Sequence, residues 1–432
     1  MESIWRKSAA VPSFPKVEKD LKTNVLIIGG GICGILCAYL LQEIGVDYIL
    51  AEADEICKKT TANTTAKISS LHGMIYNKLL NSIGKSDAYS YYLANSEAIS
   101  DYEKLCKDID CDFEKTSAYL FTLDNTNKLK KEFDAIKAIG IDASFEKKLD
   151  IPFNAMGGIK FENQAQFNPL KFISSICKDL KIYEHSRVTE MLGNCAVVGN
   201  YKITADKVIV ATHFPFINKH GSYFIKMYQH RSYVMAFKSD KKVDGMFVSD
   251  TKYGLSLRQY NDLIILGGEG HRTGKKSQGW QGLEAIANKY FPGNKVVARW
   301  AAQDCMTLDS MPYVGNYSAR TPNLYVATGF NKWGMTGSMV AAKILCDLIQ
   351  GKENKYAQLF SPSRSMLKPQ LAINAIKTMC NYLIPTTRRC PHLGCALKWN
   401  RCEHSWDCSC HGSRFANDGH LLDGPSNNDL HN

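Results

Sequence analysis

The sequence predicts an α/β protein with a large body, whose first unit is a parallel sheet covered by helices, and a small metal-binding tail rich in cysteine and histidine. Three observations support this fold class. The 432 residues leave room for two to four domains of about 100–200 residues each. A continuous apolar run, a glycine-rich turn and a helical pattern follow one another near the N-terminus. Six of the fifteen cysteines gather between Cys380 and Cys410, whereas the other nine are scattered.

Composition and charge narrow the functional classes. A hydrophobic fraction of 45% and a charged fraction of 22% are typical of folded globular proteins. The formal net charge is +11, but no run of five like charges concentrates it, so no nucleic-acid partner is expected. Residues 25–41 carry no charge, yet their glycines indicate a strand, a turn and a helix rather than a transmembrane segment. Because the first 20 residues lack an apolar signal region, we expect a cytoplasmic protein.

The N-terminal turn has the spacing of a dinucleotide-binding motif. Residues 24–28 form the apolar run of a buried parallel strand, and Gly29, Gly31 and Gly34 follow in the pattern G-x-G-x-x-G. Gly29 permits the tight turn, Gly31 lets backbone N–H groups approach a pyrophosphate, and Gly34 lets the following helix pack on the strand. A second strand carries Glu52, 18 residues after Gly34, where a carboxylate can accept hydrogen bonds from ribose hydroxyls. The chain is therefore expected to bind a dinucleotide.

Two further features favour FAD over NAD. No second G-x-G-x-x-G follows a strand, which argues against separate sites for two dinucleotides. A second glycine-rich loop, Gly329–Thr336, follows an apolar strand over 324–328 and precedes a helix that ends at Gln350. The positive end of such a helix can stabilise negative charge on a reduced flavin. An ordinary strand–helix connection is the alternative interpretation of this loop.

The tail contains one C-x-H pair and one C-x-x-H pair. Cys390 and His392 are separated by 15 residues from Cys408 and His411. Two ligands as close as those in C-x-H suit a single zinc ion poorly, but they suit a two-iron cluster with one ligand on each iron. Two thiolates and two imidazoles are the ligand set of a Rieske [2Fe–2S] cluster, so we favour this cluster over zinc. Neutral imidazoles make reduction easier, at about −150 to +300 mV against about −400 mV for plant-type clusters.

The motifs of the body occur in the order of a known family. The matching segments are Gly29–Gly34 with Glu52, Thr60–Lys67, Ala165–Leu170, Val208–Thr212, Asp309–Gly315 and Gly329–Thr336. In these segments the chain resembles the D-amino-acid-oxidase-type (DAO) family of FAD-dependent oxidoreductases, and with its tail it resembles the DAO subgroup with a fused Rieske domain. The resemblance implies a Rossmann-like FAD-binding domain, an inserted antiparallel-sheet substrate domain and a C-terminal Rieske-like β module.

The resemblance also implies domain limits. The expected ranges are 1–80, 151–225 and 300–350 for the FAD-binding domain, 81–150 and 226–299 for the substrate domain, 351–389 for a basic linker and 390–432 for the Rieske module. Rieske domains usually have several strands before the first ligand loop, whereas only the linker precedes Cys390 here. We therefore expect a Rieske module that is smaller than usual and is braced against the body.

Cofactor contacts follow from the same resemblance. Thr60, Thr61 and Lys67 are expected near the pyrophosphate and the flavin, and Val188 near the adenine. The second glycine-rich loop is expected to contribute Gly329, Trp333, Gly334, Met335 and Thr336.

In the tail, Cys395 and Cys410 match the positions at which high-potential Rieske proteins carry a disulfide. Because an intracellular disulfide is disfavoured, the sequence leaves both redox states of this pair open.

Candidate catalytic residues have weaker support than the cofactor motifs. Flavoenzymes of this type take a hydride from the carbon next to an amine, and the protein mainly orients the substrate. Arg258 is a candidate clamp for a substrate carboxylate, or else a solvated arginine at a strand edge. His72 can approach the flavin or serve as a local structural histidine. Cys305 resembles the position at which some sarcosine-oxidase-like relatives attach flavin, although buried unreactive cysteine is the usual case.

The leading hypothesis is an FAD-dependent oxidoreductase that oxidises an amine or amino-acid-like substrate. Electrons would pass to the Rieske cluster and then to an acceptor that the sequence does not identify. One alternative is an NAD(P)H-linked reductase that runs electrons in through the flavin. Another is a non-catalytic redox sensor. These hypotheses differ in which compound bleaches the flavin.

Overall fold

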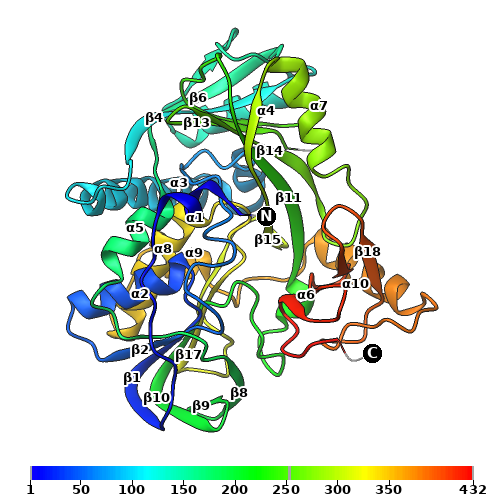
Figure 1. Cartoon of the computed structure of the whole chain (residues 1–432). Coiled ribbons are helices and arrows are strands. Elements are labelled where there is room, and N and C mark those ends of the chain that lie inside the picture. Colours follow the sequence, from blue (N-terminus) through cyan, green and yellow to red (C-terminus); the bar gives the residue numbers. More distant parts are fainter. Residues whose placement is uncertain (1, 252–253, 431–432) are drawn as a thin grey trace.

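The computed structural model describes residues 2–251 and 254–430, which form two large sheets and one small sheet (Figure 1). The first large sheet contains β1 (Leu21–Ile28), β2 (Tyr48–Ala51), β7 (Ile182–Tyr183), β8 (Val188–Leu192), β9 (Cys195–Val198), β10 (Tyr201–Val210), β16 (Tyr313–Asn316) and β17 (Leu324–Thr328). Its order is β16-β17-β10-β1-β2-β7, and β9 joins β10 to β8. Strands β17, β10, β1, β2 and β7 run parallel, as the buried apolar run near the N-terminus predicts.

The second large sheet is mostly antiparallel. It contains β3 (Lys67–Ile68), β4 (Glu114–Thr122), β5 (Ser144–Glu146), β6 (Gly157–Gln166), β11 (Met227–Lys238), β12 (Met246–Ser249), β13 (Ser256–Tyr260), β14 (Leu263–Arg272) and β15 (Lys295–Thr307). Its order is β15-β11-β14-β13-β12-β4-β6-β3, with β5 paired to β6. Figure 1 shows this sheet above the parallel sheet, with β11 and β15 extending downwards between the two. The antiparallel substrate sheet implied by the resemblance is therefore present.

Two strands cross the domain limits expected from the sequence. Residues 151–225 were expected in the FAD-binding domain, but β6 pairs with β4 in the antiparallel sheet. Residues 300–350 were expected there as well, but β15 pairs with β11 along its whole length. Backbone pairing with a distant strand decides which sheet a strand joins, and the sequence of a single strand does not specify that partner.

The helices are α1 (Ile4–Ser8), α2 (Ile32–Glu43), α3 (Tyr76–Cys106), α4 (Asn127–Ile139), α5 (Pro169–Ile176), α6 (Tyr223–Lys226), α7 (Trp280–Tyr290), α8 (Gly334–Ile349), α9 (Ala357–Phe360) and α10 (Pro369–Tyr382). Helices α2 and α8 follow the two glycine-rich loops and pack against each other in the main core. Within the described residues, no helix is both long and apolar enough to cross a membrane.

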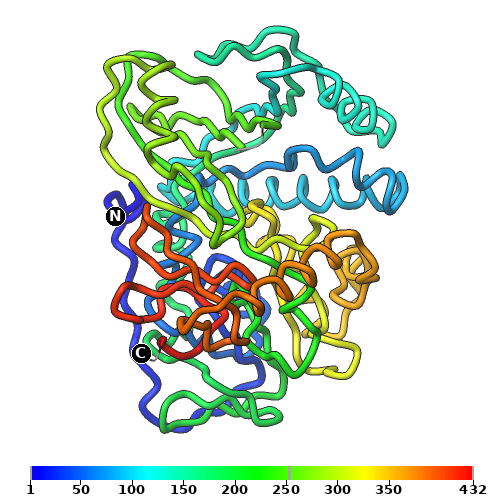
Figure 2. Tube along the Cα trace, turned by 90° about the vertical axis from the view of Figure 1, so that its right-hand side faces the viewer, coloured from blue at the N-terminus to red at the C-terminus, as the bar shows by residue number. Residues whose placement is uncertain are grey.

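The tail forms the small sheet β18-β19-β20-β21. Its strands are β18 (Leu397–Asn400), β19 (Ser405–Cys408), β20 (Arg414–Phe415) and β21 (Leu421–Asp423). All four strands follow Cys390, as expected for a Rieske module that is smaller than usual. Figure 2 shows the orange and red trace of the tail alongside the blue N-terminal part of the body, where Lys59 Nζ donates a hydrogen bond to the Leu422 carbonyl.

Candidate functional site

The first glycine-rich turn joins β1 to α2 and requires glycine at two positions. Gly29 has φ +111°, and a Cβ there would lie 2.7 Å from the Ala211 carbonyl oxygen. A Cβ on Gly34 would lie 1.9 Å from the Gly29 carbonyl oxygen, so any side chain would push the helix off the strand. A Cβ on Gly31 would meet only Thr61 Oγ1, at 3.6 Å. The backbone of the turn therefore does not require glycine at residue 31. The missing side chain of Gly31 instead leaves the space in front of the turn empty.

Glu52 follows β2 and faces this turn. One carboxylate oxygen accepts a 2.6 Å hydrogen bond from the Gly30 N–H, and the other accepts a 2.9 Å bond from the Asp54 N–H. Thr61 Oγ1 accepts a 3.0 Å bond from the Ile32 N–H at the start of α2. The side chains predicted to bind a dinucleotide are therefore oriented by the turn itself.

A cavity of about 400 Å³ extends from this turn to the start of α8. It is lined by these predicted residues: Gly29, Gly31, Glu52, Thr60, Thr61, Lys67, Val188, Trp333, Gly334 and Met335. The backbone N–H groups at the start of α8 lie at its wall, where the helix dipole favours negative charge. The following predicted residues of the body do not line it: Gly34, His72, Arg258, Gly329 and Thr336.

The two loops of the tail that carry the Cys and His pairs share one hydrogen-bond pattern. In the first loop the Gly394 N–H bonds to the Cys390 carbonyl, and in the second the Gly412 N–H bonds to the Cys408 carbonyl. Each cysteine N–H also bonds to the carbonyl five residues later, at 2.8 Å in both loops. The two loops are therefore equivalent scaffolds, each presenting one thiol and one imidazole.

All four of these side chains converge. The rings of His392 and His411 lie 4.9 Å apart, and both Nδ1 atoms are buried with no hydrogen-bond partner among the described residues. The thiols of Cys390 and Cys408 contact each other, and this contact raises the pKa of Cys390 and lowers that of Cys408. Buried ring nitrogens without a partner are costly unless they bind something. The arrangement therefore has the donor set of a two-iron cluster.

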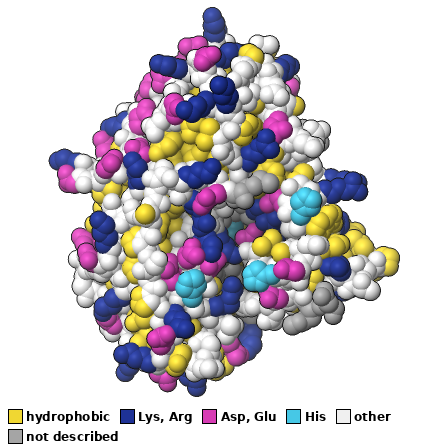
Figure 3. Space-filling view, viewed as in Figure 1, with side chains coloured by type: hydrophobic (Ala, Val, Ile, Leu, Met, Phe, Trp, Pro, Cys, Tyr) yellow, Lys and Arg dark blue, Asp and Glu magenta, His cyan; other side chains and the backbone are white. Residues whose placement is uncertain are grey.

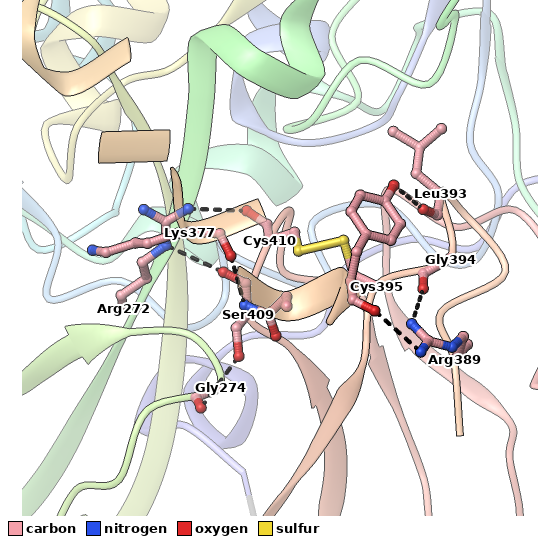
Figure 4. The surroundings of a disulfide bond; sticks show 11 residues. Arg272, Gly274, Lys377, Arg389, Leu393, Gly394, Cys395, Ser409 and Cys410 are labelled. Atoms are coloured by element: carbon pink, nitrogen blue, oxygen red, sulfur yellow. Dashed lines mark hydrogen bonds between the residues drawn. A yellow bond between two sulfur atoms is a disulfide. The ribbon is translucent and has the colours of Figure 1, made fainter. Parts of the chain in front are cut away.

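A disulfide joins Cys395 of the first loop to Cys410 of the second (Figure 4). The sulfur atoms of these two residues and of Cys408 lie within 4.8 Å of one another. We do not interpret the three as a metal site, because two of them are bonded to each other. Figure 4 shows Arg272 of the body beside this disulfide, with its guanidinium donating to the carbonyls of Ser409 and Cys410. The body thus braces the second loop.

Comparison with protein families decides the class of this chain. The FAD dependent oxidoreductase (DAO) family model matches residues 24–348, three quarters of the chain, and the Rieske [2Fe-2S] domain model matches residues 370–432. The chain belongs to the FAD dependent oxidoreductase family. It is an oxidoreductase with FAD and a [2Fe–2S] cluster as its cofactors. The Rieske match begins inside α10, so it includes part of the segment that we expected to be only a linker.

Individual relatives agree with this assignment. The chain is 34% identical to the Rieske 2Fe-2S iron-sulfur protein YhfW of Bacillus subtilis (strain 168), with 98% of this chain and 96% of the relative covered. Glycine oxidase from Geobacillus kaustophilus has the same fold as the body, with a TM-score of 0.67, 15% identity, and coverage of 80% of this chain and 99% of that one. L-proline dehydrogenase from P. horikoshii matches with a TM-score of 0.65 and 16% identity, over 80% and 98% of the two chains.

The residues present fit both cofactors of the family. For FAD, the cavity combines an open glycine turn, a carboxylate at the end of β2 and a helix N-terminus. For the cluster, the two unpartnered Nδ1 atoms and the two thiols supply four donors on equivalent loops. The His392 Nε2 atom lies 3.1 Å from Asn218 Oδ1, which fixes the ring so that Nδ1 is the nitrogen left for a metal.

Lys67 reaches the cavity from β3. Its side chain is buried and its ammonium contacts Ser256 Oγ. Burial, together with the positive charge of Arg258, lowers the pKa of Lys67 to about 7. A substantial fraction of the Lys67 side chains is therefore neutral near pH 7. A lysine paired with a carboxylate would instead be almost fully protonated at this pH.

His72 does not line the cavity. Its ring stacks on Trp333 at 4.6 Å, and it hydrogen-bonds to Tyr91 Oη, the Ser69 carbonyl and Thr336 Oγ1. Burial lowers the pKa of His72 to about 3, so the ring is neutral. The structure gives His72 the role of a local histidine that positions Trp333, which does line the cavity.

Arg258 lies behind the wall of the cavity, so the expectation of a carboxylate clamp does not fit its position. Its guanidinium donates hydrogen bonds to the carbonyls of Thr65 and Ala66, and it is 1% exposed. Ala66 has φ +55°, an unusual conformation for alanine. Arg258 therefore holds the loop that leads to Lys67.

Cys305 lines the cavity, but its thiol is in an unreactive setting. Burial raises the pKa of Cys305 well above its ordinary value, and the nearby Asp304 raises it further. A nucleophilic cysteine needs a lowered pKa. The setting of Cys305 therefore favours the buried, unreactive cysteine over covalent attachment of flavin.

Sequence reasoning missed the body residues that meet the tail. Phe214 lines the cavity, and its ring lies 6.4 Å from the ring of His392. Gln229 donates to the carbonyls of His411 and Gly424, and Gln303 donates to that of Gly412. These residues follow or lie within ordinary strands, and only the pairing of the tail with the body reveals them.

Buried charges anchor the tail to the body. Arg231 of β11 pairs with Glu403 at 2.8 Å, and Glu403 also pairs with Arg414 at 2.9 Å. Burial alone would raise the pKa of Glu403, but the two guanidinium groups hold it at about 2. Figure 3 shows side chains of both charge signs together with histidines near the centre of this face. The network fixes the orientation of the tail.

Proposed function

We propose that this chain oxidises an amine or amino-acid-like substrate in the flavin cavity and passes the electrons to the Rieske cluster of the same chain. One observation carries the proposal: the loop Gly424–Asn427 of the tail lines the same cavity as the glycine turn of the body. When bound there, FAD accepts a hydride from the substrate and the cluster accepts electrons singly. Because the tail forms part of the wall of its own chain's cavity, we propose that the cluster receives electrons from the flavin of the same chain and not from that of a neighbouring chain.

The contacts between the two sites support a short route for electrons. We propose Cys390, His392, Cys408 and His411 as the cluster ligands. Phe214 touches the cavity on one side and faces His392 on the other. Thr60 of the cavity donates to the Gln303 carbonyl, and the Gln303 side chain donates to Gly412, next to His411. One route leads to His392 and the other to Gly412, the neighbour of His411, so we propose that these two histidine positions would link the flavin cavity to a bound cluster.

The cavity wall suggests how a substrate is held. On the side of the antiparallel sheet the wall consists of small residues, which leave room beside the second glycine-rich loop: Ser232, Ser256, Gly267 and Ala302. Lys332 also lines the cavity and donates to Ser232 Oγ at 3.0 Å. We propose that Lys332, in place of Arg258, pairs with a substrate carboxylate.

Lys67 is the candidate proton acceptor. Hydride transfer from an amine requires the neutral amine, so a substrate that arrives as an ammonium ion must lose a proton first. Lys67 lines the cavity, and with a pKa of about 7 it can accept that proton near neutral pH. Solved structures of similar fold include an enzyme named for glycine and one named for L-proline, which agrees with this class of substrate.

Anaerobic reduction of the holoprotein tests the proposal. A panel of amines and amino acids is mixed with the protein while flavin absorbance and the EPR signal of the reduced cluster are followed. The proposal predicts that one compound class bleaches the flavin and then produces a Rieske signal. In Cys408→Ser the flavin should still bleach without that signal, whereas Cys380→Ser, which alters an exposed cysteine, should behave as wild type.

Two outcomes would contradict the proposal. Rapid bleaching by NADH or NADPH, with none by any amine, would favour the NAD(P)H-linked reductase. Bleaching by an amine with no cluster signal in the wild type would separate the two cofactors.

A further inference from the structure

Helix α10 is arranged with its polar side towards the protein and its apolar side towards solvent. Asn374 and Asn381 are 3% and 6% exposed, whereas Ile376, Met379 and Leu383 are 60%, 66% and 82% exposed. The surface helices of globular proteins usually have the opposite arrangement. We call Leu367, Ile373, Ile376, Met379 and Leu383 the α10 apolar stripe; successive members from Ile373 are three or four residues apart, so they share one face of the helix.

The polar contacts of α10 fix this orientation. Asn374 accepts a 2.9 Å hydrogen bond from Arg272 and donates one to the Ile225 carbonyl. At the end of the helix, Tyr382 Oη donates to the Leu393 carbonyl in the first ligand loop. Turning the apolar stripe inwards would break these hydrogen bonds. The stripe is therefore held outwards by the same residues that support the cluster loops.

The segment that carries the stripe is basic. Residues 365–402 contain six basic residues and no acidic residue: Lys368, Lys377, Arg388, Arg389, Lys398 and Arg401. Lys275 and Lys276 of the body follow Arg272, which is bonded to α10. This segment therefore carries +6 of the chain's formal net charge of +11.

We propose that the α10 apolar stripe docks this protein on the surface of an anionic lipid bilayer. An apolar helix face flanked by basic residues is the pattern of helices that lie in the membrane interface. Apolar side chains would enter the headgroup region while the lysines and arginines meet anionic lipid. A second copy of the chain is a poorer occupant, because its own stripe carries the same positive charge and would be repelled. Docking on α10 would bring the cluster loops next to the bilayer.

Vesicle sedimentation of the full holoprotein tests this proposal. Vesicles of phosphatidylcholine with phosphatidylglycerol are compared with vesicles of phosphatidylcholine alone. Wild type should partition at least tenfold more strongly onto the anionic vesicles, and added salt should weaken the binding. Ile376→Ser/Met379→Ser should lose at least tenfold of the partitioning. The control Met156→Ser/Leu192→Ser, which alters two exposed apolar residues of the body, should retain it.

Flavin absorbance and the cluster signal of each variant report whether its cofactor sites remain intact. Equal partitioning of the wild type and the stripe variant would overturn the proposal. A protein that ignores both vesicle types and forms a dimer that Ile376→Ser/Met379→Ser dissociates would also overturn it, because a second copy would then cover the stripe.

Discussion

Replacing Arg231 tests whether buried charges hold the tail against the flavin domain. Arg231 and Arg414 share Glu403, and all three side chains are at most 10% exposed. The ordinary pKa of a glutamate is 4.5 and that of Glu403 is about 2, a difference that corresponds to about 3 kcal/mol. Arg231→Met removes one of the two cations and leaves a buried carboxylate partly unpaired. Removing one partner of a buried pair costs about 3–5 kcal/mol.

We therefore expect Arg231→Met to raise the equilibrium constant for local opening of the tail roughly 100-fold, which is about 3 kcal/mol. The assay is the rate at which excess chelator removes the visible absorbance of the cluster, because the chelator reaches the iron only when the tail opens. Glu403 has a lowered pKa, so its contribution is present above pH 4.5 and is lost as the pH falls through about 2. A measurement at pH 7 therefore reads the whole effect.

Arg299→Met is the matched control. Its partner is Glu284, and both side chains are about one-third exposed or more, so the loss should stay below about 1 kcal/mol. Equal bleaching rates in Arg231→Met and Arg299→Met would refute the reasoning, since the network would then not hold the tail.

Three further predictions concern the cofactor sites. Gly31→Ala should keep the circular dichroism of the wild type but retain less than about a tenth of its FAD, because its Cβ meets only Thr61 at 3.6 Å yet enters the cofactor space; wild-type flavin content would disprove this. With the proposed substrate, kcat/KM should rise with pH through an apparent pKa of about 7 as Lys67 loses its proton, and Lys67→Met should remove that limb of the profile. Cys395→Ser should destabilise the tail by about 3 kcal/mol, since the disulfide closes a loop with a sequence separation of 15. The chelator assay described above measures this loss, and in the same assay Cys380→Ser should bleach at the rate of the wild type.

The local motifs could be predicted because each is specified by neighbouring residues. The turn Gly29–Gly34 follows from sterics that act within six residues, and the predicted apolar run over residues 24–28 forms the second half of β1. The Cys and His pairs of the tail lie on loops whose hydrogen bonds span five residues. Gly84, with φ +81°, interrupts α3. Its effect is local too, but a single glycine in a helical pattern does not show whether the helix resumes.

The roles of Arg258, His72 and Phe214 depend on tertiary structure. Arg258 lies on a strand, and its sequence neighbours do not show that its guanidinium faces the Thr65 and Ala66 carbonyls nearly 200 residues away. From the sequence, His72 is a candidate active-site histidine. The structure shows that its ring stacks on Trp333 instead. Phe214 gains its significance from its contact with His392, which belongs to the tail and is distant from it in sequence.

By itself, the sequence determined the class of this protein: the two cofactors, the order of its parts and most of the residues that could hold each cofactor. These follow from short motifs in which backbone geometry and ligand chemistry act over a few residues. Only the tertiary structure decided that the tail lines the cavity of its own chain, that burial beside Arg258 lowers the pKa of Lys67, and that α10 turns its apolar side outwards. Each of these depends on burial and on the pairing of charges and hydrogen-bonding groups far apart in the chain, and such contacts have no signature in any one segment.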